Sequence, residues 1–398
     1  MSAMKPLRGI RVIDLSDWLG AYPGRLFADL GAEVIRVEPP GGSARRFTPP
    51  LLADGISAGF AFTEAGKSSV MLDVTDPADA GQIHRLLASA QVLVTSQGPA
   101  ILAAGGLDTE TTSTRYPGLI HLAISPFGQT GPDADRPATD LTLLAAGGLL
   151  ALGGDPDREP VRPWGEQSSV IVGVHAATAA LIALLVLEST GCGQVVDVSA
   201  QEAIAHSTEN AVQYFDLEDV VRLRAGAGPV EAGTGLFQCL DGWVYLVGGL
   251  GGRPLAWEAI IEWLESSGVV ADPLREPRWQ ERDFRCSTPA VEQFRALFEG
   301  FAAGRTKQEL HEEGQYLGIS IAAVATATDV LDSPQLVDRD FFRDVEIGGR
   351  ALRFPGSPYR MTDTATDLRI GPGPIPMQIG TPSLRNASAH PLPVGATA

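Results

Sequence analysis

The sequence is poor in cysteine and in positive charge, and each shortage excludes a class of protein. Its 398 residues include three cysteines, Cys192, Cys239 and Cys286, which lie far apart and without metal-site spacing. We expect free thiols of a reducing, cytoplasmic environment and no metal ligands. Lys and Arg total 30 against 48 Asp and Glu, which gives a net charge of −18. Such a surface repels polyanions, so nucleic acid and anionic membranes are poor partners.

Two motifs are missing near the N-terminus. The first residues pass directly into a strand pattern, without the charged and apolar regions of a secretory signal. The turn after the first strand reads DWLGAYPGR, which contains glycines but lacks the GxGxxG spacing of a dinucleotide-binding loop. We therefore expect neither a signal peptide nor a dinucleotide bound through that motif.

The sequence contains one long apolar run, at residues 169–187, whose length would span a bilayer. The run is rich in Ala and Gly, carries His175 and Thr178, and stands alone in an otherwise ordinary sequence. A buried central helix is therefore expected instead of a membrane span. His175 is interpreted as a core histidine.

The first hundred residues alternate between strand and helix patterns, which is typical of βαβ units and a parallel sheet. Strand patterns occupy residues 10–16, 33–40, 70–74 and 92–96, and helical patterns occupy residues 26–32, 77–90 and, farther on, 201–212. Four parallel strands place the loops at residues 19–23, 38–42 and 96–99 along one carboxyl edge. A ligand is expected along that edge.

The second half of the chain changes character after a Gly-rich linker. From residue 235 the pattern predicts a β-hairpin with Asp241 and Gly242 at its turn. Helical segments follow, so residues 225–325 are expected to form a smaller α+β domain. Strand patterns return at residues 319–326 and 344–354. The Pro/Gly/Ala-rich tail at residues 373–398 is expected to be extended.

Four collinear stretches carry a resemblance to a known family. They read PLRGIRVIDLSDWLGAYPGRLFADLGAEVIRVEPPGG, IHLAISPFGQTGPDADRPATDL, ALLVLESTGCGQVVDVS and ISIAAVATATDVLDSPQLVDRDFFRDVEIGGRALRFPGSPYR. They resemble the class III CoA-transferases, the family of formyl-CoA transferase, carnitine CoA-transferase and the α-methylacyl-CoA racemases. The resemblance covers nearly the whole chain in the same order. The resemblance implies an α/β fold, with a Rossmann-like large domain built from both chain ends, at residues 1–224 and 326–372. It also implies a dimer of interlocked rings.

The resemblance locates the residue expected to do the covalent work. In transferases of this family, an Asp near the start of the long apolar helix attacks the acyl-CoA thioester. A mixed anhydride forms first and an aspartyl-CoA thioester follows. Counted back from the GCGQ motif, the matching position is Ser169. A hydroxyl can be acylated, but it has no carbonyl of its own through which to form a thioester with CoA.

Two nearby carboxylates are alternative candidates for a catalytic role. Glu166 lies three residues before Ser169, close to one helical turn, so it could present a carboxylate at a similar place. Otherwise it is an acid in the first turn of the helix. Asp140 falls where family members carry Glu or Asp near the active site, which implies a positioning or acid/base role. The alternatives are an Asp140 that caps its own helix, and Ser168 or Ser169 as the N-cap of the long helix.

Coenzyme A is expected as a substrate, with no permanently bound cofactor. The candidate CoA-binding residues lie at positions that match the family's segments or along the carboxyl edge: Lys67, Arg36, Gly20, Ser96, Gln97 and Gly98. Among these, the resemblance implies that the Lys67 ammonium meets a CoA phosphate.

Two classes of function remain open. The first is an enzyme that transfers CoA between a thioester and a carboxylic acid. The second is a non-catalytic family member, or the partner subunit of a heteromeric transferase whose other chain supplies the Asp. A racemase is less favoured, because Thr139 replaces the His that racemases place before the Asp at 140. The expected partners are acyl-CoA, a carboxylic acid, and a second copy or an Asp-bearing homologue.

Overall fold

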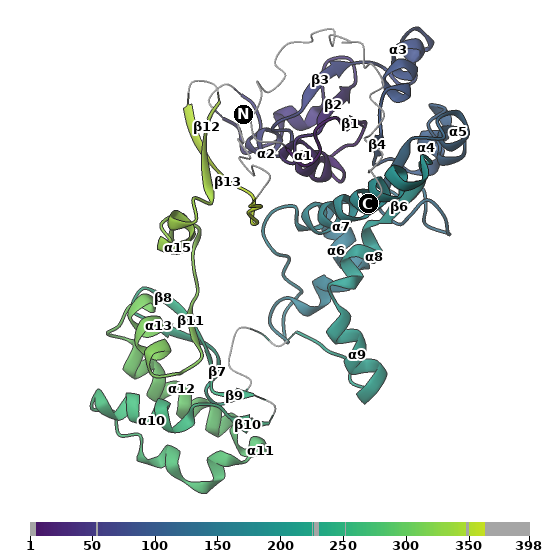
Figure 1. The fold of residues 1–398 in the computed structure, drawn as a ribbon. Coiled ribbons are helices and arrows are strands. Elements are labelled where there is room, and N and C mark those ends of the chain that lie inside the picture. Colours follow the sequence, from purple (N-terminus) through teal and green to yellow (C-terminus); the bar gives the residue numbers. More distant parts are fainter. Residues whose placement is uncertain are drawn as a thin grey trace, which may run out of the picture. The chain divides into compact units, whose positions relative to one another are not determined.

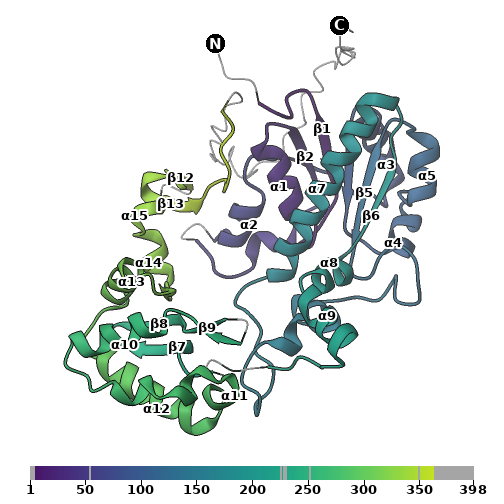
Figure 2. The same cartoon turned by 60° about the horizontal axis from the view of Figure 1, so that its bottom comes forward.

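The computed structural model describes residues 5–52, 55–224, 226, 231–250, 252–347 and 350–362. The chain forms two compact units, whose elements are drawn in Figures 1 and 2. One unit joins residues 1–151, 162–221 and 335–398, and the other joins residues 152–161 and 222–334. The predicted tail at residues 373–398 lies outside the described residues. The boundaries predicted at residues 225 and 325 stay predictions.

A parallel sheet of six strands forms the centre of the first unit. The strands are β1 (Arg11–Asp14), β2 (Glu33–Glu38), β3 (Ser68–Met71), β4 (Val92–Thr95), β5 (Ile120–Ser125) and β6 (Val195–Ser199). Their order is β3-β2-β1-β4-β5-β6, and each neighbouring pair is parallel. The predicted α/β fold with a Rossmann-like sheet is confirmed. Because the strand order reverses between β1 and β4, the loops after these two strands diverge and leave room for a ligand.

Helices cover both faces of this sheet, because successive strand residues point to opposite sides. Val12 packs with Phe27 and Val172 in one buried core, whereas the next residue, Ile13, packs with Leu86 in another. The helices and 3-10 turns of this part of the chain are α1 (Ala21–Asp29), η1 (Ala44–Phe47), α2 (Ala58–Thr63), α3 (Pro77–Ala88), α4 (Pro99–Ala104), α5 (Thr109–Arg115), α6 (Asp140–Ala146), η2 (Leu149–Leu152), α7 (Gln167–Thr190), α8 (Ala200–His206), α9 (Glu209–Glu218) and α15 (Pro334–Asp338).

The long apolar run forms α7, which lies across the sheet beside α1 (Figure 2). Gly173 allows this close approach, since a Cβ there would lie 2.9 Å from the ring of Tyr22. The opposite face leaves Val174, Ile182 and Leu185 exposed. By length and composition α7 could cross a membrane, and 33% of its most apolar window is buried within the chain. The predicted burial of this helix is therefore only partial in a single chain, and His175, interpreted as a core histidine, is exposed.

The helix predicted over residues 201–212 is interrupted, so that prediction is wrong in detail. α8 ends at His206, and α9 begins at Glu209. Between them, the hydroxyl of Thr208 donates a hydrogen bond to the backbone carbonyl of Ala205 at 2.7 Å. Such a bond from a hydroxyl to a nearby carbonyl competes with the regular helical bonds and favours a helix end.

The two ends of the described chain share one core in the first unit. The strands β12 (Phe342–Ile347) and β13 (Arg350–Pro355) form an antiparallel hairpin. Its side chains Val345 and Phe354 pack with Phe60 of α2. The prediction of a large unit built from both chain ends is therefore confirmed.

The second unit has a small antiparallel sheet covered by helices with an aromatic core. The predicted β-hairpin is present, but its turn lies one residue earlier than predicted, at Leu240 and Asp241, because Gly242 begins β8 and pairs with Cys239. In the core, the ring of Trp257 packs against those of Trp279 and Phe294. Its elements are β7 (Thr234–Cys239), β8 (Gly242–Val247), β9 (Gly249–Leu250), β10 (Arg253–Pro254), α10 (Trp257–Ser266), η3 (Asp272–Arg275), η4 (Pro277–Gln280), α11 (Arg282–Arg285), α12 (Thr288–Ala302), α13 (Lys307–Tyr316), β11 (Ile321–Ala323) and α14 (Ala327–Leu331).

Candidate active site

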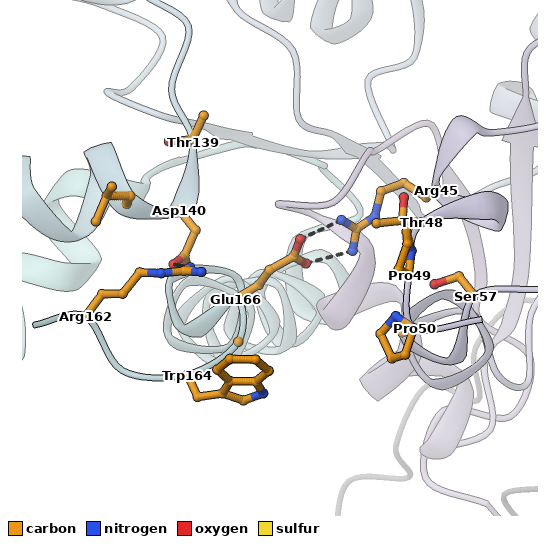
Figure 3. A pocket seen from close by; sticks show the side chains of 13 residues that line it. Arg45, Thr48, Pro49, Pro50, Ser57, Thr139, Asp140, Arg162, Trp164 and Glu166 are labelled. Carbon is orange, nitrogen blue, oxygen red and sulfur yellow. Dashed lines mark hydrogen bonds and ion pairs between the residues drawn. The ribbon is translucent and has the colours of Figure 1, made fainter. Parts of the chain in front are cut away.

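A pocket of about 710 Å³ lies beside the start of α7, within the first unit. Four charged side chains line it: Arg45, Asp140, Arg162 and Glu166 (Figure 3). Prolines, a leucine and the indole of Trp164 supply the apolar part of the wall. A volume of this size is typical of sites for small organic molecules.

Glu166 is held in this pocket by Arg45. The Nη1 and Nη2 atoms of Arg45 donate to Oε1 and Oε2 of Glu166 at 2.6 and 2.7 Å, a bidentate charge-assisted pair. Arg45 lies in η1, where the hydroxyl of Ser43 accepts a hydrogen bond from its backbone N–H. Glu166 is the N-cap residue of α7, but its side chain makes no capping bond. The Glu166 side chain remains 43% exposed.

Asp140 caps the start of α7 and does not cap its own helix. Its Oδ1 accepts hydrogen bonds from the backbone N–H of Ser168 at 2.9 Å and from the Ser168 hydroxyl at 2.7 Å. The N-cap of α6 is Thr139, whose hydroxyl takes that role in a capping box. The Oδ2 atom of Asp140 is buried and makes no hydrogen bond within the described residues. Arg162 Nη1 lies 3.6 Å from this atom, as an ion pair.

Ser169 is nearly buried, with 5% of its surface exposed. Its hydroxyl donates to the backbone carbonyl of Glu166 at 2.8 Å, one turn back along the same helix. The N-cap prediction for Ser168 or Ser169 is wrong, because both residues lie inside α7 and Glu166 holds the N-cap position. Ser169 is not among the residues that line the pocket.

Lys67 and Arg36 belong to a buried network of charges. Lys67 Nζ lies 2.8 Å from Asp14 Oδ2 and 2.7 Å from Glu64 Oε2, and it also donates to the carbonyl of Ala21. Arg36 Nη1 lies 3.3 Å from Glu64 Oε1. Burial by itself would raise the pKa of Asp14, but the charges of Lys67 and Arg36 lower it below the usual range.

This burial disagrees with the sequence-based expectation for Lys67. None of its side chain is exposed, and internal oxygens already surround the ammonium. The CoA phosphate contact expected for Lys67 therefore does not fit this geometry, and neither does CoA binding by Arg36, which is 3% exposed.

A second pocket, of about 250 Å³, lies at the carboxyl edge of the sheet. Leu15, Glu38 and Gln97 line it, at the ends of β1, β2 and β4. The Gln97 amide donates to the carbonyl of Leu15 and ties the two diverging loops together. Burial would raise the pKa of Glu38, but hydrogen bonds from Arg46 and Ser69 lower it to about 2. Glu38 is therefore an anion at neutral pH.

The other three candidate residues shape these loops. The Ser96 hydroxyl accepts from the backbone N–H of Asp17 and donates to its carboxylate, both at 2.7 Å. A Cβ at Gly20 would lie 2.5 Å from Cβ of Ser16, so no larger residue fits there. Gly98 is the N-cap residue of α4. Within the described structure, these three residues set the backbone conformation of the loops and offer no side chain for ligand binding.

The sequence interpretation missed the two arginines and the tryptophan of the larger pocket. A signal existed for each arginine, because an anionic ligand of such an acidic chain needs a local cluster of Arg. Arg45 lies three residues after Gly42, in the loop that follows the second strand. Arg162 and Trp164 stand in the segment REPVRPWG, just before the long apolar run.

Known proteins show what this chain is similar to. A family model for CoA-transferase family III matches residues 7–377. The chain is 35% identical over 365 residues to the succinyl-CoA:(R)-benzylsuccinate CoA-transferase subunit BbsE of Thauera aromatica, which covers 90% of this chain and 88% of that protein. It is 28% identical to the succinyl-CoA–D-citramalate CoA-transferase of Chloroflexus aurantiacus, across 84% of this chain and 82% of that protein.

A solved structure resembles this chain as well. The CAIB/BAIF family protein from Brucella suis has a TM-score of 0.80 at 26% identity, with 90% of this chain and 93% of that chain covered. Sequence and fold therefore agree along nearly the whole chain. The protein belongs to CoA-transferase family III.

Proposed function

We propose that this chain is one subunit of a heteromeric CoA-transferase that moves CoA from an acyl-CoA, such as succinyl-CoA, to a carboxylic acid. The observation that carries the proposal is the hydroxyl of Ser169, at the position where the family resemblance requires a carboxylate. The relative BbsE is itself a subunit of a CoA-transferase. A second, Asp-bearing chain would then supply the nucleophile.

The chemistry explains why a hydroxyl at this position is insufficient. A carboxylate of the enzyme attacks the thioester carbonyl, and the CoA thiolate leaves as a mixed anhydride forms. The thiolate then attacks the enzyme's own carbonyl, so the donor acid leaves and an enzyme–CoA thioester forms. The acceptor acid repeats the two exchanges in reverse. A serine side chain has no carbonyl carbon for the thiolate to attack, so Ser169 cannot complete the exchange.

Coenzyme A would bind as a substrate at the carboxyl edge of the sheet. The smaller pocket lies there, between loops that diverge where the strand order reverses, which is a common ligand position in such sheets. Its wall combines apolar side chains with the amide of Gln97 and the carboxylates of Glu38 and Asp73. This part of the proposal does not need the buried Lys67.

The second subunit would cover the apolar face of α7. Val174, Ile182 and Leu185 are exposed on this helix, and Phe215 and Leu217 are exposed on α9. Large exposed apolar areas of this kind mark protein interfaces. An interlocked dimer, as the family resemblance implies, would bury them against either a second copy or an Asp-bearing homologue.

A second candidate keeps catalysis within this chain and uses Glu166 as the nucleophile. Its carboxylate lines the pocket and is 43% exposed, which favours access by a substrate. For that role, Glu166 would have to leave the two hydrogen bonds from Arg45. These bonds stabilise the carboxylate and reduce its nucleophilicity, so this mechanism is the weaker candidate.

The two candidates predict different results for the purified chain. We expect no exchange of labelled CoA into succinyl-CoA by this chain alone, and exchange once an Asp-bearing partner that co-purifies with it is added. Exchange by the chain alone would contradict the heteromeric proposal. In that case, Glu166→Gln should reduce the rate about a thousandfold or more if Glu166 is the nucleophile. Glu188→Gln, at an exposed position near the end of the same helix, serves as the control.

A further inference from the structure

The larger pocket contains an arginine whose hydrogen-bonding capacity is mostly unused. Arg45 is already engaged by a partner, because both of its Nη atoms donate hydrogen bonds to Glu166. Arg162 differs, since its one ion pair among the described residues joins Nη1 to Asp140 Oδ2 across 3.6 Å. That separation is too long for a hydrogen bond. The Arg162 side chain is 49% exposed and therefore open to a ligand.

The partner of Arg162 is also poorly satisfied. Asp140 Oδ1 receives two hydrogen bonds from Ser168, whereas Oδ2 is buried and receives none within the described structure. Figure 3 shows Arg162 extending along this carboxylate and Arg45 approaching from the opposite side, with Glu166 between them. The Arg162 guanidinium is therefore positioned in the pocket beside Asp140, while its N–H donors remain available for a ligand.

We propose that Arg162 is a specificity-determining residue, which binds the carboxylate of a dicarboxylic substrate that is remote from the reacting carboxylate. This inference rests on the proposed function, in which a carboxylic acid exchanges CoA. An acid that reacts through its only carboxylate cannot leave that group in a bidentate pair with Arg162. A second carboxylate can remain there, because the planar guanidinium matches its two oxygens.

The remaining walls of the pocket agree with a small dicarboxylic acid. Pro49, Pro50 and Trp164 supply apolar contacts for a carbon skeleton, and the indole is 92% exposed. The pocket volume of about 710 Å³ is ample for such an acid.

Calorimetric titration with two four-carbon acids tests the proposal by binding alone. Succinate, with two carboxylates, is expected to bind the purified full-length chain at millimolar concentrations, and butyrate, with one, is expected to bind at least about tenfold more weakly. Arg162→Gln should weaken succinate binding about 10- to 100-fold and remove the preference for succinate over butyrate. Arg136→Gln, an exposed ion-paired arginine outside the pocket, should change neither affinity.

Several results would overturn the inference. These are equal succinate binding by wild type and Arg162→Gln, equal binding of the two acids by wild type, and no succinate binding with or without CoA present. Competition of inorganic phosphate with succinate would instead indicate a general anion site. Circular dichroism and CoA binding of each variant confirm that it is folded. The chain could also bind succinate through Arg162 and yet show no CoA exchange, alone or with a partner. That result would contradict the proposed function but would support this inference.

Discussion

Replacing Lys67 with methionine is expected to lower the free energy of unfolding by about 3–5 kcal/mol. The Lys67 ammonium is fully buried between Asp14 and Glu64, at 2.8 and 2.7 Å. Methionine has a similar length but no charge, so two buried carboxylates lose their nearest cation. Arg36 offsets only part of this loss, because it lies 4.0 Å from Asp14 and 3.3 Å from Glu64. Urea unfolding followed by far-UV circular dichroism measures the change.

An exposed arginine provides the control for this experiment. Arg136 pairs with Asp133 at 3.1 Å, but its side chain is 64% exposed. Arg136→Met should therefore change the free energy of unfolding by less than about 1 kcal/mol. A Lys67→Met variant of nearly normal stability that binds CoA much more weakly would contradict the structural role. That result would instead support the contact between Lys67 and a CoA phosphate that the family resemblance implies.

Acidification from pH 7 to pH 5 is expected to remove about 2 kcal/mol of stability through His121 alone. This histidine lies in β5 and is 1% exposed. Its two ring nitrogens contact the hydroxyls of Thr95 and Thr112 at 2.9 and 2.8 Å, which suits a neutral ring with one donor and one acceptor. Burial lowers the pKa of His121 from 6.5 to about 4. Between about pH 4 and pH 6.5, His121 is therefore protonated in the unfolded chain but neutral in the folded chain.

The direction of the effect follows from that difference. The stabilisation from neutral His121 is fully present above pH 6.5 and is lost as the pH falls to about 4. His121→Gln should therefore flatten the dependence of unfolding free energy on pH between 7 and 5, whatever its absolute stability. His84→Gln is the control, because His84 lies nearer the surface, although burial lowers its pKa too. An unchanged slope in His121→Gln would refute the prediction.

The sequence predicted the local elements of the fold well because their signals act between neighbours. The β-branched pattern of Val92–Thr95 and the helical pattern of Pro77–Ala88 each specify an element from within. The break between α8 and α9 was missed. There, a hydroxyl of Thr208 competes with helical bonding, a local effect that hydrophobic periodicity does not register.

The candidate site was only partly predictable. The sequence and its family resemblance pointed to the start of α7, where Glu166 and Asp140 do line one pocket. They did not indicate that Asp140 would cap α7, because the capped residue Ser168 is 28 residues away. They also implied a CoA phosphate contact for Lys67, since a lone lysine in a polar segment carries no sign of the carboxylates that surround it after folding.

By itself, the sequence determined the α/β class, the order of the elements and the hydroxyl at Ser169, because periodicity, turn chemistry and residue identity are properties of the chain. The tertiary structure alone decided which charges meet. Arg45 and Glu166 are 121 residues apart and form a bidentate pair, while Arg162 keeps most of its donors free beside Asp140. Such pairings depend on how strands and helices pack. The tertiary structure therefore sets the hydrogen-bond and ion-pair partners of the ionisable side chains in this site.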